Sequence, residues 1–248
     1  MKSEPWGPRL RLNKSEEPKT LTDATLHRLR RDIISGKLVA GQKLRAQELM
    51  AAYSVGTSPL REALFQLVSD GLVLSEGQRG FQVANLSNPE LLEITEWRAH
   101  LECIALSRAI EQGDVEWEAV AVAAFHRLKR LEEMELDEVV MADLWEDRHT
   151  EFHFALYQGC GSPWLLRFCE MLGEHAQRYR RAFVRYRRIT PSIMEEHKAI
   201  LDAAIARRQE EAVGLLDAHI RHASDMAQQF LASPRDDDAP ANTKKTKR

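Results

Sequence analysis

Apolar residues recur at spacings of three and four positions from about residue 89 to residue 232, which is the pattern of amphipathic helices. Leu91, Ile94, Trp97 and Leu101, for example, fall on one stripe of a helix. The pattern predicts helices over residues 89–112, 114–133, 138–158, 162–186, 191–206 and 209–232, with a break near the middle of the fourth as an alternative. A series of helices with short connections predicts an antiparallel all-α bundle.

Upstream of this region, shorter apolar patterns are separated by turn residues. Helices are predicted over residues 23–35, 46–53 and 59–71, with Thr22 and Ser58 as the N-caps of the first and third, and Pro59 at the first helical position of the third. Two short strands, 72–75 and 81–84, flank the glycine-bounded turn 76-EGQRG-80. Three helices followed by a β-hairpin are typical of a winged helix-turn-helix domain.

The change of pattern at 85-NLSNPE-90 predicts a domain boundary. We expect a winged helix-turn-helix domain over residues 20–86 and a helical domain over residues 89–232, which together make a mostly α fold. Residues 1–19 and 233–248 are polar and lack apolar periodicity, so both ends are predicted to be disordered.

Composition narrows the class of protein further. The 248 residues are 44% hydrophobic and 29% charged with a net charge of -3, so any nucleic-acid binding must come from a local patch. No segment approaches the roughly 18 continuous apolar residues of a membrane span. Cys103, Cys160 and Cys169 have neither zinc-finger nor disulfide-framework spacing, which favours buried thiols in a reducing compartment. We therefore expect a cytoplasmic protein.

The start of the third predicted helix has the composition of a DNA-contacting face. Its apolar positions point inward, whereas Thr57, Ser58 and Arg61 point outward after Gly56. Arginine can donate two hydrogen bonds to guanine, and a helix N-terminus favours phosphate. The turn between the strands adds Gln78 and Arg79.

The small positive charge of this domain limits the DNA-binding interpretation, and one alternative to it stays open. Residues 20–86 carry a net charge of only +2, so we expect that two such domains act together in a homodimer. The alternative is a protein-binding winged helix in which Arg61 pairs with Glu48 or Glu62.

Four histidines in the helical region have spacings that predict convergence. His149 and His153 are one turn apart on an otherwise apolar face. His197 and His219 are 22 residues apart, and a turn centred near Arg208 would place them level across a helical hairpin. Imidazole groups around one centre suit Zn²⁺ and other transition metals. The alternative is that these are hydrogen-bonded core histidines, because the same helices also carry core leucines.

The run 55-VGTSPLREALFQLVSDGLV-73, followed by 79-RGFQVANLS-87, resembles the signature of the GntR family of bacterial regulators. The resemblance extends over residues 21–231, because the helical remainder is similar to the FadR-type FCD effector domain. It implies a DNA-binding regulator and no enzymatic activity. The family commonly has arginine where this chain has Thr57, so the operator should differ from that of better-known members. The implied DNA contacts are Gln47, Gly56, Thr57, Ser58, Arg61 and Gly80.

The resemblance also implies a metal ion, because many FCD domains bind one through an acidic residue, a histidine four positions later and two further histidines. His153, His197 and His219 fall on the three histidine positions, and His149 falls on the acidic one. The site would offer four imidazoles and no carboxylate, and direct binding by His149 is left open. Zn²⁺ is the expected metal, with Ni²⁺ or Mn²⁺ as alternatives.

Within the family, residues 145–166 are most similar to the CsiR-type repressors, which are associated with GABA and short dicarboxylate breakdown. This similarity implies a small carboxylate effector, of the C4 to C6 dicarboxylate class, bound at the metal and by Arg98 and Arg148. The alternatives are an ion pair of Arg98 with Glu102 and an exposed Arg148. The basic run 178-RYRRAFVRYRR-188 is expected to be a solvated helix face, with an effector contact from Arg178 or Tyr179 as the alternative.

The expected function is thus a ligand-responsive bacterial transcriptional regulator, with repression relieved by the effector. The competing interpretation is a helical metalloenzyme that carries a winged-helix module. Metal-assisted hydrolysis normally also requires a general base, and the available acids, Glu151 and Glu196, each lie beside a histidine and should point away from the cluster.

Overall fold

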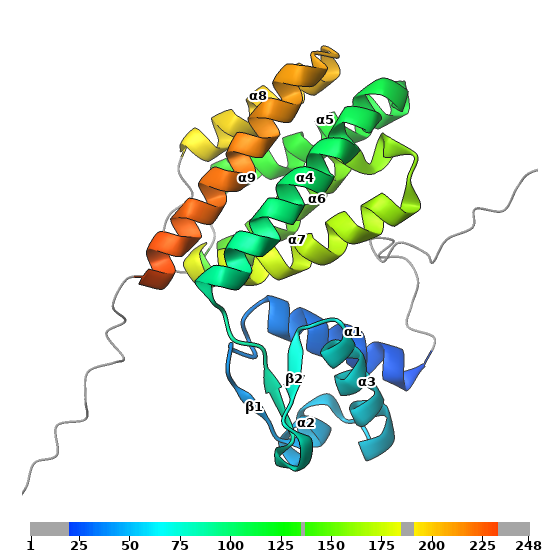
Figure 1. Cartoon of the computed structure of the whole chain (residues 1–248), viewed down its shortest axis with the longest axis vertical. Helices are drawn as coiled ribbons and strands as arrows, with labels where there is room; N and C mark the ends of the chain where they lie inside the picture. The colour runs from blue at the N-terminus through cyan, green and yellow to red at the C-terminus, as the bar shows by residue number, and fades with distance from the viewer. Residues whose placement is uncertain (1–19, 135–136, 185–190, 233–248) are drawn as a thin grey trace, which may run out of the picture.

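The computed structural model describes residues 20–134, 137–184 and 191–232 of the chain. Within these ranges, a smaller part with three helices and a sheet lies below a larger all-helical part in Figure 1. The predicted mostly α fold, a winged helix-turn-helix followed by a helical bundle, is confirmed. The two ends predicted to be disordered lie outside the described residues.

The smaller part has the element order of a winged helix-turn-helix domain. It runs through α1 (Leu21–Ile34), β1 (Lys43–Leu44), α2 (Ala46–Tyr53), α3 (Thr57–Ser69), β2 (Val73–Ser75) and β3 (Phe81–Val83). The sheet order is β1-β3-β2 with antiparallel neighbours, and Val73 lies opposite Val83. The sequence pattern does not predict β1, because two residues are too few to show a periodicity.

The core of this domain forms where the apolar stripes of α1 and α3 meet. Leu29, Leu60, Leu64 and Leu67 are each at most 1% exposed. Burial of one such side chain contributes about 1.5–3 kcal/mol. The inward packing of these leucines leaves the opposite face of α3 to solvent.

Two predicted helix starts are each wrong by two residues. Thr20, not Thr22, caps α1, because its hydroxyl accepts a hydrogen bond from the Asp23 backbone N–H at 3.0 Å. Gly56, not Ser58, is the N-cap of α3, so Pro59 lies in the first turn rather than at the first position. Proline is tolerated there because the first backbone N–H groups of a helix have no partner within it.

The larger part is a bundle of the helices that the apolar periodicity predicts. They are α4 (Asn88–Gln112), α5 (Val115–Lys129), α6 (Glu138–Tyr157), α7 (Pro163–Val184), α8 (Pro191–Ile205) and α9 (Gln209–Ala232). The alternative of a break within α7 is wrong, because the helix is continuous. In Figure 1, α9 runs beside α4, and α8 and α9 form a hairpin. No helix within the described ranges is both long and apolar enough to cross a membrane.

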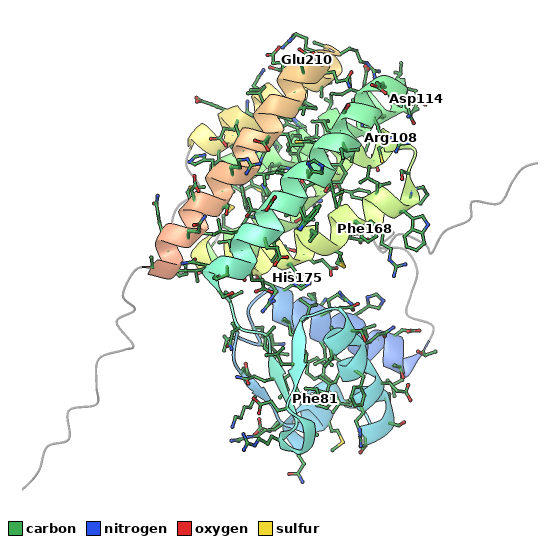
Figure 2. The ribbon with its side chains drawn as sticks, in the orientation of Figure 1. Phe81, Arg108, Asp114, Phe168, His175 and Glu210 are labelled. Carbon is green, nitrogen blue, oxygen red and sulfur yellow. The ribbon has the colours of Figure 1, made fainter. Side chains whose placement is uncertain are left out.

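Helix α7 joins the two parts of the molecule. Its Glu174 pairs with Arg30 of α1 at 2.7 Å, and Arg30 also pairs with Asp70. His175 donates from Nε2 to the Asp70 carbonyl oxygen at 2.9 Å and lies at the junction of the two parts in Figure 2. Arg178 donates to the carbonyl oxygen of Ala84 in the connecting segment. The helix therefore contacts both the winged-helix domain and the chain that leads out of it.

The prediction that the basic run 178–188 is a solvated face is wrong for its described beginning. Arg178, Tyr179 and Arg181 are 5%, 2% and 9% exposed. Tyr179 donates to Glu90, and Arg181 forms ion pairs with Asp143 and Asp147 of α6. Residues 185–188 lie outside the described residues. Acids of α6 neutralise Arg180 and Arg181, so the described part of the run packs against other helices and does not face solvent.

Candidate metal centre and nucleic-acid interface

His149 and His153 occupy the inner face of α6. Both are buried, at 3% and 4% exposed, and the fully buried Phe152 and Leu156 fix the orientation of that face. The Trp145 ring stacks on His149 with centroids 4.5 Å apart and an interplanar angle of 18°. The apolar positions around the two histidines therefore direct both imidazoles into the bundle.

His197 on α8 and His219 on α9 complete a four-histidine cluster. The turn between these helices, with Arg207 at a φ of 59°, brings the two rings to a centroid distance of 4.5 Å. One ligand nitrogen from each of the four histidines lies within 4.8 Å of the others. The structure thus brings together all four side chains that the sequence analysis singled out.

The distances between nitrogens suit a shared metal ion. His153 Nε2 lies 3.1 Å from His149 Nε2 and 3.3 Å from His197 Nε2. Two nitrogens bound to one ion at about 2.1 Å lie about 3.0–3.4 Å apart at octahedral or tetrahedral angles. Hydrogen bonds account for the same distances less well, because a single ring nitrogen has either one proton or one in-plane lone pair for its two neighbours. The four residues therefore fit a metal ion.

The surroundings of His149, His153 and His197 favour the neutral form of their imidazoles, which is the form that binds a metal ion. Burial is the largest cause that lowers the pKa of His149, His153 and His197 well below the ordinary histidine value. Neighbouring imidazoles and the charge of Arg180 lower each of these pKa values further. Binding of a divalent ion consequently need not displace protons near neutral pH.

Glu196 holds the last histidine of the cluster in one tautomer. His219 donates from Nδ1 to Glu196 Oε2 at 2.7 Å, and His222 donates from Nδ1 to Glu196 Oε1 at 2.9 Å. Such a carboxylate fixes the ring orientation of a metal-binding histidine and leaves its Nε2 lone pair available. The expectation that Glu196 points away from the cluster is therefore wrong. Glu151 does point away, because it pairs with Arg127 and Arg148.

The two predicted effector-binding arginines differ in their placement. Arg98 is 7% exposed and donates from Nε to Glu102 at 2.7 Å, so it is both buried and paired. Its charge contributes to the lowered pKa of His153. The Arg148 side chain is 36% exposed and pairs with Glu151, outside the histidine cluster. Of these two arginines, only Arg98 is buried near the histidine cluster.

A third arginine, Arg180, lies beside the cluster, and the sequence does not predict its position. The Arg180 side chain is 11% exposed and lies 3.3 Å from the carboxylate of Glu146, which is fully buried. Burial lowers the pKa of Arg180 against the opposing effect of Glu146. Arg180 belongs to the basic run 178–188, whose charge alone predicts a solvated face. The residues around Arg180 in the sequence therefore do not indicate that it lies beside the histidines.

The winged-helix domain presents a cationic groove between α3 and the sheet. Thr57, Ser58 and Gln47 are exposed, and so are Gly56 at the start of α3 and Arg79 in the turn. Gly80 is half-buried at the end of that turn, and the side chain of Gln78 lies outside the described part. The groove has a volume of about 650 Å³ and its basic lining residues are Lys43, Arg45, Arg61 and Arg79.

The acids near α3 leave Arg61 available to a ligand. Glu48 pairs with Arg45 at 3.0 Å. Glu62 accepts hydrogen bonds from Ser58 at 3.3 Å and from Thr22 at 3.2 Å. Among the described side chains, neither acid forms an ion pair with Arg61. The alternative in which one of them neutralises Arg61 is therefore not supported.

Comparison with known families and structures agrees with this architecture. The family model described as "Bacterial regulatory proteins, gntR family" matches residues 21–83, and the FCD domain model matches residues 93–222. The chain belongs to the GntR family and carries an FCD domain. This GntR-family chain is a DNA-binding transcriptional regulator and not an enzyme, so the metalloenzyme interpretation is wrong.

Relatives of similar length exist among bacterial regulators. The chain is 38% identical to the transcriptional regulator BphR of Paraburkholderia xenovorans, over 86% of this chain and 87% of the relative. It is also 38% identical to the transcriptional repressor GlaR of Escherichia coli, over 82% of this chain and 94% of the relative. Escherichia coli McbR/YncC has the same fold, with a TM-score of 0.72, 22% identity and coverage of 86% and 99%.

Removal of the carboxylate that orients His219 is expected to weaken metal binding by this GntR-family protein. In Glu196→Leu, the His219 ring loses its Nδ1 acceptor, and such a change typically costs 10–100-fold in metal affinity. Zn²⁺ affinity measured by competition with a chromogenic chelator checks this expectation. Glu195→Leu, at the exposed neighbouring position, is the matched control and should bind Zn²⁺ as the wild type does. Equal affinities in the two variants would contradict it.

Proposed function

We propose that this GntR-family regulator is a repressor that leaves its operator when a small carboxylate binds at a metal ion in the FCD domain. The observation that carries the proposal is the convergence of four buried imidazoles, with Nε2 distances of 3.1 and 3.3 Å, in a domain that binds effectors. The histidine cluster lies on α6, α8 and α9 of the helical domain, whereas the DNA-contacting groove lies in the winged-helix domain. This separation suits an effector site that acts on a DNA-binding site.

His149, His153, His197 and His219 would hold the ion, with Zn²⁺ as the first candidate and Ni²⁺ or Mn²⁺ as alternatives. When bound, the ion supplies a divalent positive charge and open coordination positions. The resemblance to FCD domains implies an acid at the position of His149, but its Nε2 lies as close to His153 Nε2, at 3.1 Å, as His197 Nε2 does, at 3.3 Å. We therefore include His149 among the ligands.

The charges around the cluster favour an anionic effector. Arg98 and Arg180 are balanced by the buried acids Glu102 and Glu146. Imidazoles that bind a metal ion are neutral and Glu196 contributes one negative charge, so a divalent ion leaves the site with an excess positive charge. A C4 to C6 dicarboxylate matches that excess, with Arg98 as its guanidinium partner. Arg148 pairs with Glu151 outside the histidine cluster, so its position does not support a role in effector binding. The proposal also includes the similarity to CsiR-type repressors, whose association with short dicarboxylate breakdown suits an effector of this class.

Helix α7 provides a physical connection between effector and DNA. Arg180 contacts the histidine cluster region through Glu146, whereas Glu174 and His175 contact the winged-helix domain. A rigid helix with contacts at both places can bias the position of the DNA-binding domain when the effector alters its packing. In a homodimer, such a shift changes the spacing of the two recognition helices and weakens operator binding.

On the DNA side, we propose that α3 enters the major groove and that Arg61 recognises guanine. Its neighbours at the helix start provide hydroxyl and backbone N–H groups for phosphate. The wing places Arg79 close to the backbone of the duplex. The proposed DNA contacts are Gln47, Gly56, Thr57, Ser58, Arg61, Gln78, Arg79 and Gly80.

Native mass spectrometry of the purified protein with a panel of C4 to C6 mono- and dicarboxylates tests this proposal. We expect a dimer with about one metal ion per chain, and a dicarboxylate adduct that disappears when a chelator removes the metal. Adduct formation that is indifferent to chelation would contradict the link between metal and effector.

A further inference from the structure

A large aromatic side chain is exposed on the face of α3 that we assign to DNA. Phe65 is 48% exposed and follows Arg61 by one helical turn. An isolated exposed apolar residue is common and carries no meaning by itself. Phe65 is not isolated, because it lines the cationic groove and contacts a residue on either side.

The first contact holds the proposed base-recognising residue. The Arg61 guanidinium carbon lies 5.8 Å from the centroid of the Phe65 ring, within the range of a cation–π interaction. Neither Glu48 nor Glu62 pairs with Arg61 among the described residues. A long arginine side chain without an acidic partner samples many rotamers, and the ring is the feature that restricts them.

The second contact ties this unit to the wing. Phe65 meets Phe81 of β3 edge to face, with centroids 5.3 Å apart and an interplanar angle of 80°. Phe81, labelled in the lower part of Figure 2, directly follows Gly80, which has a φ of 99° and ends the turn that carries Arg79. This edge-to-face contact joins the recognition helix to the strand that follows the wing turn.

We propose that Phe65 is a positioning residue for DNA recognition, which holds the Arg61 guanidinium for one guanine and fixes the wing relative to α3. The inference rests on the proposed role of Arg61 and adds to it a second determinant of sequence specificity. A positioning residue alters discrimination at the base pair that Arg61 contacts and leaves the phosphate contacts intact.

The test begins with selection of duplexes from a random pool by the full-length protein. Affinity is then measured for the selected duplex and for duplexes with each base pair replaced in turn. The variants are Arg61→Ala, Phe65→Leu, Phe65→Tyr and the double variant Arg61→Ala/Phe65→Leu. Leu74→Ala is the matched control, because Leu74 is 46% exposed in the same domain and does not line the groove.

Arg61→Ala should remove discrimination of roughly 5- to 150-fold at one base pair of each half-site. Phe65→Leu should reduce discrimination at that same base pair about 2- to 5-fold, the size of an exposed cation–π interaction. Phe65→Tyr should retain it, and Phe65→Leu should have no further effect when Arg61 is already alanine. The slope of affinity against salt should stay unchanged in Phe65→Leu, because no phosphate contact is lost.

Three outcomes would overturn the inference. An equal loss of affinity on every duplex in Phe65→Leu would assign Phe65 a structural role. A changed preference at a different base pair would assign it a direct contact with a base. If Arg61→Ala leaves discrimination intact, the proposed role of Arg61 fails and the positioning role fails with it. When Arg61→Ala has its expected effect, either of the first two outcomes overturns the positioning role of Phe65 alone, and this separates the two proposals.

Discussion

Replacement of His153 with alanine is expected to lower the metal content of the purified protein from about one ion per chain to less than about a tenth, even after incubation with zinc. His153 Nε2 is the nitrogen that both His149 Nε2 and His197 Nε2 approach, at 3.1 and 3.3 Å. Its loss leaves the remaining imidazoles without their common neighbour. Elemental analysis by inductively coupled plasma mass spectrometry measures the result.

The same variant should still bind operator DNA but no longer release it with a carboxylate. The winged-helix domain has its own core, which includes buried leucines of α1, α2 and α3. His100→Ala is the matched control, because His100 is exposed on α4 of the same helical domain. Metal retained by His153→Ala, or lost equally by the control, would contradict the assignment of the cluster.

Arg180→Met is expected to destabilise the protein by about 3–5 kcal/mol, because it leaves a buried carboxylate without its partner. Glu146 is fully buried and its carboxylate lies 3.3 Å from Arg180. Denaturation of the metal-free protein with urea measures the change in the free energy of unfolding.

The double variant Arg180→Met/Glu146→Leu separates this cause from a general packing defect. Replacement of both partners by apolar groups removes the stranded charge, so most of the lost stability should return. Arg208→Met is the surface control, since Arg208 pairs with Glu211 where both side chains are about half exposed. A double variant as unstable as Arg180→Met alone would show that the ion pair is not the cause.

The elements that local periodicity specifies could be predicted from the sequence. The bundle helices begin and end within a few residues of their predicted positions, because each has an apolar stripe and a polar connection. The convergence of His149, His153, His197 and His219 was predictable for a related reason: the turn beside Arg208 lies midway between the last two.

What the sequence did not reveal depends on contacts between distant segments. A run of arginines reads as a solvated face until acids on other helices are known to meet it, as Glu146 meets Arg180 and Asp143 meets Arg181. Glu196 of α8 joins the cluster by accepting hydrogen bonds from His219 and His222, which lie on a different helix, α9. The exposed Phe65 shows the same limit, since its partner Phe81 lies on the wing.

The most direct test of the metal-dependent repressor is an operator titration with dicarboxylate, followed by fluorescence anisotropy on metal-loaded and metal-stripped protein. The account predicts that both forms bind the selected duplex and that only the metal-loaded form releases it as the dicarboxylate is added. Release with the same midpoint in both forms would contradict it, because the effector would then act without the four-histidine metal site.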